Sequence, residues 1–363
     1  MFYTLLFYII SNLLCTQIKD RKKAMQAVFT FAAIYMSLRY NYPSDYPAYQ
    51  GAFYQYSNPG YVYDPDTDHM EYGWFLLNRL FAPLGYYVFV AFCSCIFAYG
   101  LYVITEAIVP KVYLPLVVLG LFVMGSFEIL MSAQRQLLVT GIFLIAYRWL
   151  IYQRINGLKS LFKIRTLLYF AIIFMCLFFH KSALFLMFIP FLYVLPSKSP
   201  AVMLGLAVAA VFLLLYGNLY LVDFFEQLQE ESGEYSYMVF TGEYSGTVSF
   251  LQASMWIFQF ICVSHVYLKY SYDNNEKAIM LISMLSILII ISGYSLGQIA
   301  RLTHFIYMFS FMVFAIIAQK LKGRSFQKTY ILVNWAWVIW NAMKVFSIPR
   351  GTLYEYKLLL FNL

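Results

Sequence analysis

The stretch "YYVFVAFCSCIFAYGLYVITE", residues 86–106, contains no charged residue before its last position, Glu106. A helix of about 20 apolar residues is long enough to cross the hydrocarbon core of a bilayer, which is roughly 30 Å thick. Similar runs recur along the whole chain, whose mean hydropathy is +0.69 and whose charged fraction is 12%. A soluble domain carries about 25% charged residues. Alternating strands of about ten residues are not seen, so the sequence predicts an all-α integral membrane protein rather than a barrel.

The apolar runs predict about twelve transmembrane helices, and we expect one transmembrane domain over residues 1–363. The candidate spans are residues 2–18, 24–40, 86–106, 111–127, 133–152, 166–180, 182–196, 201–220, 251–270, 278–297, 302–320 and 329–346. The pair at 166–196 is short and contains Pro190. Two short spans and a partly re-entrant hairpin both fit this pair.

The basic connections 19–23, 154–165 and 320–328 predict the orientation of the chain. Cytoplasmic loops are enriched in lysine and arginine, which puts the N-terminus outside. Because "KDRKK" follows the first apolar run, that run is expected to be an uncleaved anchor. Two longer segments then face outward: residues 41–85, with an interfacial helix in "EYGWFLLNRLFAPLG", and the acidic, aromatic residues 221–250. The net charge of +8 fits this topology without a nucleic-acid partner.

A few basic residues at the outward helix ends oppose this rule: Arg39, Arg135, Arg301, and His180 with Lys181. A single arginine there could extend to the lipid headgroups. Several from distant positions at one depth predict a shared outward-facing cavity. A guanidinium matches phosphate oxygens in bidentate pairs, so these arginines are candidate phosphate ligands.

Three side chains near these arginines are candidates for proton transfer: Asp45, Glu71 and His180. His180 is the preferred base, because the charge of Lys181 is expected to keep its imidazole neutral. Tyr49 and Trp74 belong to an aromatic-rich stretch that suits either sugar stacking or an aromatic belt at the membrane boundary.

Metal chemistry is not expected, because arginines can stabilise an anionic leaving group without a cofactor. The alternating aspartates of "DPDTD", residues 64–68, leave a weak divalent-ion site open. The five cysteines all fall in apolar runs and show no disulfide or zinc spacing, so we expect them to be packing residues.

Five motifs occur in a familiar order: "RYNYPSDYPAY" (39–49), "MEYGWFLLN" (70–78), "SAQRQLL" (132–138), "FFHKSAL" (178–184) and "GQIARLTHFIYMF" (297–309). Together they resemble the EpsG family of bacterial exopolysaccharide proteins, which is similar to the Wzy-type O-antigen and capsule polymerases. The resemblance implies a multipass glycosyltransferase of the bacterial inner (cytoplasmic) membrane. Its substrates would be undecaprenyl-pyrophosphate-linked oligosaccharide repeat units, joined at the outer face, and its partners the bilayer and other polysaccharide assembly proteins.

The resemblance also implies roles for the residues that match the motifs. Arg39, Arg135 and Arg301 would bind the pyrophosphate, and His180, Asp45 or Glu71 would activate the acceptor hydroxyl. Tyr49, Trp74, Gln136 and Lys181 would contact the substrate. Three other functions fit the sequence: a flippase or transporter of lipid-linked sugars, a glycan ligase, and a non-catalytic scaffold.

Overall fold

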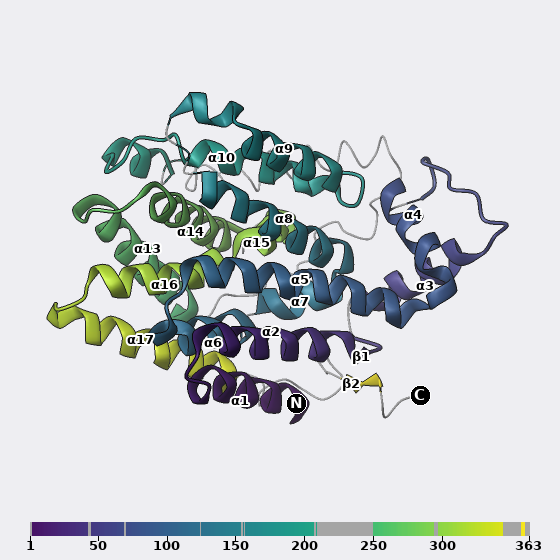
Figure 1. The fold of residues 1–363 in the computed structure, drawn as a ribbon, viewed down its shortest axis with the longest axis horizontal. Helices are drawn as coiled ribbons and strands as arrows, with labels where there is room; N and C mark the ends of the chain where they lie inside the picture. Colours follow the sequence, from purple (N-terminus) through teal and green to yellow (C-terminus); the bar gives the residue numbers. More distant parts are fainter. Residues whose placement is uncertain are drawn as a thin grey trace. The chain divides into compact units, whose positions relative to one another are not determined.

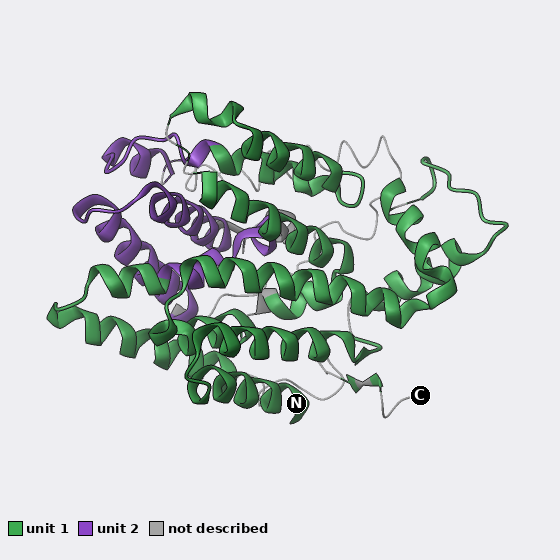
Figure 2. Cartoon of the chain, viewed as in Figure 1, with its two compact units in different colours: residues 1–190, 314–363 green, residues 191–313 purple. Residues whose placement is uncertain are grey.

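The computed structural model describes residues 2–42, 45–68, 70–123, 125–153, 155, 157–206, 208, 250–293, 297–343 and 357–359. It divides into two compact units, residues 1–190 with 314–363 (unit 1) and residues 191–313 (unit 2), coloured separately in Figure 2. The predicted span 201–220 lies largely outside the described residues, and so does the predicted loop 221–250.

The described part of unit 1 is helical apart from one pair of short strands (Figure 1). Its elements are α1 (Phe2–Gln17), α2 (Arg21–Ser37), β1 (Arg39–Tyr40), α3 (Tyr46–Ser57), α4 (Tyr72–Phe81), η1 (Ala82–Leu84), α5 (Tyr86–Ile108), η2 (Lys111–Tyr113), α6 (Leu114–Val123), α7 (Gly125–Ser132), α8 (Gln134–Gln153), η3 (Leu158–Phe162), α9 (Ile164–Cys176), η4 (Lys181–Phe188), α17 (Ser325–Met343) and β2 (Lys357–Leu358). Unit 2 holds α13 (Phe250–Lys269), α14 (Asn274–Gly293) and α15 (Gly297–Ile306). Two helices cross the boundary between the units, α10 (Ile189–Leu192) and α16 (Phe309–Lys320).

Most predicted helices are confirmed to within a few residues, as for α1, α5, α8 and α13. Other boundaries were wrong: the predicted helix 111–127, for example, is replaced by α6, which ends at Val123, and α7, which continues to Ser132. The predicted helix 302–320 is divided by a turn after Ile306 into α15 and α16. The predicted helix 24–40 ends at Ser37, and Arg39 belongs to β1 instead.

The described helices support a helical membrane protein, but they do not support the count of twelve spans. Within the described residues, three helices are long and apolar enough to cross a membrane: Tyr86–Ile108, Leu251–Lys269 and Asn274–Ile291. Other apolar helices are 10–17 residues long, among them α1, α9 and α16.

The segment from α9 to α10 turns back after a short helix, and two short spans and a partly re-entrant hairpin both still fit it. Helix α9 has 13 residues and is therefore about 20 Å long, shorter than the roughly 30 Å hydrocarbon core. The chain turns after Cys176, passes through His180 in an extended conformation and continues as η4. The Tyr169 hydroxyl donates to the Leu186 carbonyl at 2.7 Å, which fixes η4 beside α9.

Helix α5 is central to unit 1, because it packs against both α2 and α8. Glycines allow the close approach of α5 and α8. A Cβ added at Gly141 would lie 2.7 Å from the Phe97 Cα, and one added at Gly100 would lie 2.7 Å from the Gly141 carbonyl oxygen. Small residues at such crossings let helix backbones pack closely within membranes.

The basic residues of unit 1 collect where α1 joins α2 and where α5 ends. Arg21 Nε donates to the Val109 carbonyl at 2.9 Å, and Lys111 Nζ donates to the Cys15 carbonyl. Arg148 forms an ion pair with Glu106 at 2.9 Å. These residues lie at the C-terminal end of α5, whereas α3 and α4 lie near its N-terminal end (Figure 1).

In unit 2, a buried lysine on α14 supports the chain that follows α10. Lys277 Nζ donates to the carbonyls of Tyr193 and Leu195, at 2.7 Å each. The Ser283 hydroxyl donates to the Phe309 carbonyl at 2.7 Å and links α14 to the start of α16.

Candidate functional site

Helices α3 and α4 form a small layer beside the N-terminal end of α5 (Figure 1). Pro47 stands in the first turn of α3, where its missing N–H costs no helical hydrogen bond. Arg79, in the last turn of α4, donates to the Tyr56 carbonyl at 3.2 Å and to the Tyr61 carbonyl at 2.8 Å. This arginine therefore fixes the end of α3 to α4, and it is structural.

Gly73 brings α4 against the turn that precedes His180. A Cβ added at this glycine would lie 2.5 Å from the Phe178 carbonyl oxygen and 2.8 Å from the Phe178 Cβ. Only a residue without a side chain allows this approach. Because Glu71 is the residue just before α4, the packing of Gly73 on Phe178 also places the Glu71 carboxylate next to the turn that contains His180.

The Glu71 carboxylate is the centre of the site. Its Oε2 accepts a hydrogen bond from Arg135 Nη1, and its Oε1 accepts one from the Lys181 main-chain N–H at 2.8 Å. The Nδ1 of His180 lies 3.6 Å from the same Oε1. Burial raises the pKa of Glu71, but His180, Arg135 and the Lys181 N–H outweigh burial and lower this pKa to about 2. Glu71 is therefore ionised at neutral pH, which makes it a weak base and a strong partner for cations.

Arg135 lies in the first turn of α8, between Glu71 and Tyr49. Its Nε donates to the Tyr49 hydroxyl at 3.3 Å. Its Nη2 donates no hydrogen bond to any residue that the structure describes, and it is not enclosed. The side chains of Arg135, Glu71 and His180 are 17%, 11% and 20% exposed, so the three groups lie at the edge of the protein interior.

The charged group that lies beside the His180 imidazole is the Glu71 carboxylate. From the sequence, the charge of Lys181 was expected to keep this imidazole neutral. A carboxylate at Nδ1 favours the tautomer with the proton on that nitrogen. In many hydrolases a buried carboxylate orients the catalytic histidine in this way.

Arg39 is completely buried and does not share this edge. Its Nη1 donates to the Met36 carbonyl and to the Ser94 hydroxyl, the latter at 2.8 Å. Its Nε and Nη2 are buried without a hydrogen-bond partner in the described chain, and its guanidinium lies 5.6 Å from the centre of the Tyr46 ring. The described conformation therefore encloses the predicted phosphate ligand Arg39.

Asp45 connects the start of α3 to the end of α7. Its main-chain N–H donates to the Ser132 hydroxyl at 2.8 Å, three positions before Arg135. Asp45 therefore belongs to the same end of unit 1 as Glu71 and His180. Its role as a base stays a prediction.

Tyr49 and Trp74 are covered by other side chains. Trp74 is completely buried and Tyr49 is 6% exposed, and the two rings meet edge-to-face at 5.7 Å. The structure thus gives the predicted sugar stacking no exposed ring face at these positions. Gln136 is also buried, and Lys181 is exposed.

Arg301 is part of α15 in unit 2, and its side chain lies outside the described residues. Its predicted convergence with Arg39 and Arg135 therefore stays a prediction. In "DPDTD", the carboxylates of Asp64 and Asp68 accept hydrogen bonds from their own loop. The described residues contain no group of three or more acids, histidines and cysteines that could hold a metal ion.

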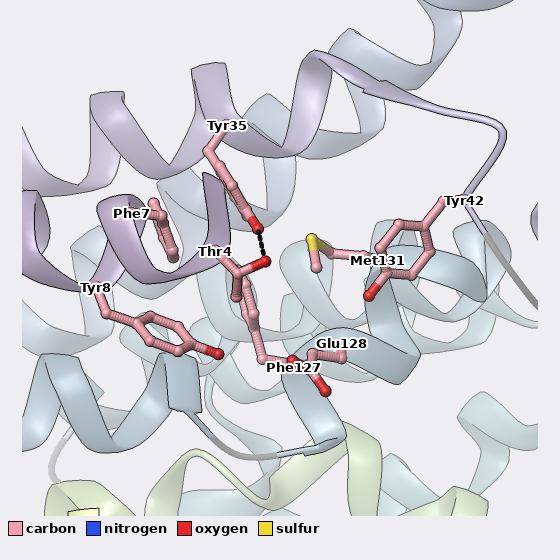
Figure 3. Close-up of a pocket in the computed structure, with 8 residues that line it drawn as sticks. All are labelled: Thr4, Phe7, Tyr8, Tyr35, Tyr42, Phe127, Glu128 and Met131. Carbon is pink, nitrogen blue, oxygen red and sulfur yellow. Dashed lines mark hydrogen bonds between the residues drawn. The ribbon is translucent and has the colours of Figure 1, made fainter. Parts of the chain in front are cut away.

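The sequence interpretation did not single out Glu128, which lines a pocket between α1, α2 and α7 (Figure 3). The pocket is a narrow hollow that includes none of the predicted site residues. Its polar groups include the Tyr35 hydroxyl, which donates to Thr4 at 3.2 Å. An isolated acid within an apolar segment was the signal that could have identified it.

The comparison with known families agrees with the motifs in the sequence. The profile described as the EpsG family matches residues 22–358, nearly the whole chain. No curated protein and no solved structure matched the chain. The matched range contains Glu71, Arg135 and His180 as well as the strands β1 and β2. The chain is therefore a member of the EpsG family.

Proposed function

We propose that this protein is a polymerase that joins lipid-linked oligosaccharide repeat units into a surface polysaccharide. The substrates would be oligosaccharides on undecaprenyl pyrophosphate, and the reaction would take place at the outer face of the bacterial inner membrane. Membership of the EpsG family supports the general class, a polysaccharide polymerase. The observation that carries the chemistry is the contact of one ionised carboxylate, Glu71, with both Arg135 and the His180 turn.

In the proposed reaction, an acceptor hydroxyl attacks the anomeric carbon of the donor's reducing-end sugar. The new C–O bond forms as the bond between that carbon and the pyrophosphate oxygen breaks, and the electron pair leaves with the pyrophosphate. The hydroxyl proton passes to a base on the protein. Negative charge therefore grows on the leaving group as the transition state is approached, and a fixed cation there stabilises the transition state more than the ground state.

Arg135 is suited to receive this charge. Glu71 and Tyr49 fix two of its nitrogens, which leaves Nη2 for a phosphate oxygen. The exposed Lys181 adds a second positive charge next to the site, so the pair with Glu71 does not make the site neutral. Arg39 and Arg301 remain candidates for further phosphate contacts.

His180 is the proposed base. Its Nδ1 lies 3.6 Å from the Glu71 carboxylate, just beyond hydrogen-bond distance, and contacts between catalytic groups often shorten to hydrogen bonds only when substrate binds. Nε2 would then take the proton of the acceptor hydroxyl. A positioned base of this kind typically contributes about 10²–10⁴-fold to the rate.

The test uses purified protein in lipid nanodiscs with one synthetic undecaprenyl-pyrophosphate-linked repeat unit. Wild-type protein is expected to produce a ladder of longer lipid-linked glycans. Arg135→Lys keeps the charge but loses the planar fork, so we expect at least about a 100-fold lower rate with normal membrane insertion. The matched control is Arg148→Lys, on the same helix but paired with Glu106 at its other end, and it should elongate normally.

The outcomes separate the candidate functions. Transport of the substrate without elongation would favour the flippase, and transfer of the glycan to a different acceptor would favour the ligase. A normal distribution of chain lengths from Arg135→Lys would remove this arginine from the mechanism.

A further inference from the structure

The end of the described chain returns to the strand that contains Arg39. Strands β1 and β2 pair antiparallel, with Arg39 opposite Leu358 and Tyr40 opposite Lys357. The pairing continues one residue further, because the Leu359 N–H donates to the Leu38 carbonyl at 2.8 Å. Both strands belong to unit 1, although more than 300 positions of sequence separate them.

The opposite edge of β1 faces α3. Alternate residues of a strand direct their main-chain groups to opposite edges. Leu38 accepts from Leu359 on one edge, and the Arg39 carbonyl accepts from the Tyr46 hydroxyl at 3.1 Å on the other. β1 is therefore held between β2 and the first residue of α3.

Helix α3 in turn supports the proposed site. Its residue Tyr49 accepts a hydrogen bond from Arg135 at 3.3 Å, and Asp45, just before α3, is bound to Ser132. The start of α3 also packs on α5, where the Tyr46 and Tyr86 rings meet at 5.4 Å. A shift of β1 would therefore be transmitted through Tyr46 to the residues that fix Arg135.

We infer that residues 357–359 form a strap that pairs with β1 and positions α3, and with it Arg135, for the reaction. The assignment of the strap as a positioning element rests on the proposed function. The strand pairing and the Leu359 hydrogen bond are made by main-chain groups, so we expect the strap to depend more on the Leu359 N–H than on the side chain at this position. The match to the EpsG family reaches residue 358 and so includes both residues of β2.

One experiment tests the pairing without any measurement of activity. Tyr40→Cys and Lys357→Cys are combined in one chain with a protease site inserted in residues 221–250. Residues directly opposite in antiparallel strands have Cβ atoms about 4.5–5.5 Å apart, within reach of a short bifunctional thiol reagent. After treatment in membranes and proteolysis, the two fragments should stay joined. A variant with only one of the two substitutions keeps the five native cysteines and should give separate fragments, which controls for links made by the native thiols. Separate fragments from the double variant would overturn the strap.

A second experiment tests the positioning role with a matched pair of variants. Leu359→Pro removes the N–H that donates to Leu38, whereas Leu359→Val keeps it. In the nanodisc assay we expect Leu359→Pro to lower kcat for the lipid-linked repeat about tenfold with KM little changed, because Arg135 acts on the transition state, and with unchanged membrane abundance and melting temperature. Leu359→Val should match the wild type.

The two experiments fail in different ways. If the double-cysteine variant stays joined but Leu359→Pro has an unchanged kcat, the strand pair is kept and the positioning role is overturned. Wild-type protein that elongates nothing would refute the proposed function, and with it the positioning role, while the cross-link would still decide whether the strands pair.

Discussion

Arg39 and Arg135 show how different two arginines at one end of unit 1 can be. Arg135 faces a carboxylate at the edge of the protein, and its Nη2 donates no hydrogen bond within the described chain. Arg39 is enclosed, and its nearest described partners are a hydroxyl, a carbonyl and the Tyr46 ring. A buried cation without an anionic partner is costly, and the contact with an aromatic ring offsets only about 0.5–2 kcal/mol. From the sequence, Arg39 and Arg135 were equally good candidates for phosphate ligands. The structure surrounds them with different groups.

Glu71 gives a prediction about pH at the scale of one residue. The pKa of its carboxyl is about 2 in the folded protein and 4.5 as a reference value, so the ionised form favours the folded state. This difference corresponds to about 3 kcal/mol of folding stability. The contribution is fully present above about pH 4.5 and is lost as the pH falls through about 2. Glu71→Gln should therefore lower the unfolding free energy most at pH 7 and progressively less below pH 4.5.

The measurement is denaturant unfolding in detergent at several pH values. Asp66→Asn is the control, because Asp66 is an exposed acid of the neighbouring loop. It should change the stability little at any pH. A deficit of Glu71→Gln that is as large at pH 3 as at pH 7 would contradict the assigned ion pair.

The crossing of α5 and α8 gives a prediction at the scale of elements. Gly141→Ala places a Cβ 2.7 Å from the main chain of Phe97, which forces the two helices apart. Such overpacking costs typically 1–3 kcal/mol, and because α8 begins with the residues that hold Glu71, we expect lower activity as well. Melting temperature and elongation rate measure the two effects.

Gly51→Ala is the matched control for this crossing. Gly51 lies inside α3, and a Cβ added there meets nothing within 4 Å. Alanine is favoured over glycine in a helix by about 1 kcal/mol, so this variant should be as stable as the wild type or more so. Equal melting temperatures for both variants would show that α5 and α8 do not approach as closely as described.

At the scale of the molecule, the sequence predicted those features that depend on residues close together in the chain. Apolar runs located most of the helices. Basic residues that oppose the positive-inside rule, with two outward acids, predicted a larger group to which Arg135, His180 and Glu71 belong. Contacts across many positions could not be read from the pattern. The pairing of Glu71 with Arg135 depends on Gly73 packing on Phe178, and the strand at Arg39 requires a partner from the far end of the chain.

The orientation of unit 1 in the membrane is the prediction on which an outer-face reaction depends. The acidic segment that contains Val62 precedes α4, whereas Leu158 begins η3 within the basic segment 154–165. Lysine and arginine are retained in the cytoplasm, so the first segment should face outward and the second inward. Both side chains are exposed, at 81% and 66%, and are suitable positions for a reactive cysteine. In intact cells a membrane-impermeant thiol reagent should label Val62→Cys, and it should label Leu158→Cys only after permeabilisation. The parent protein gives the background from its own cysteines. The reverse pattern would place Glu71, Arg135 and His180 toward the cytoplasm and would exclude polymerisation on the outer face.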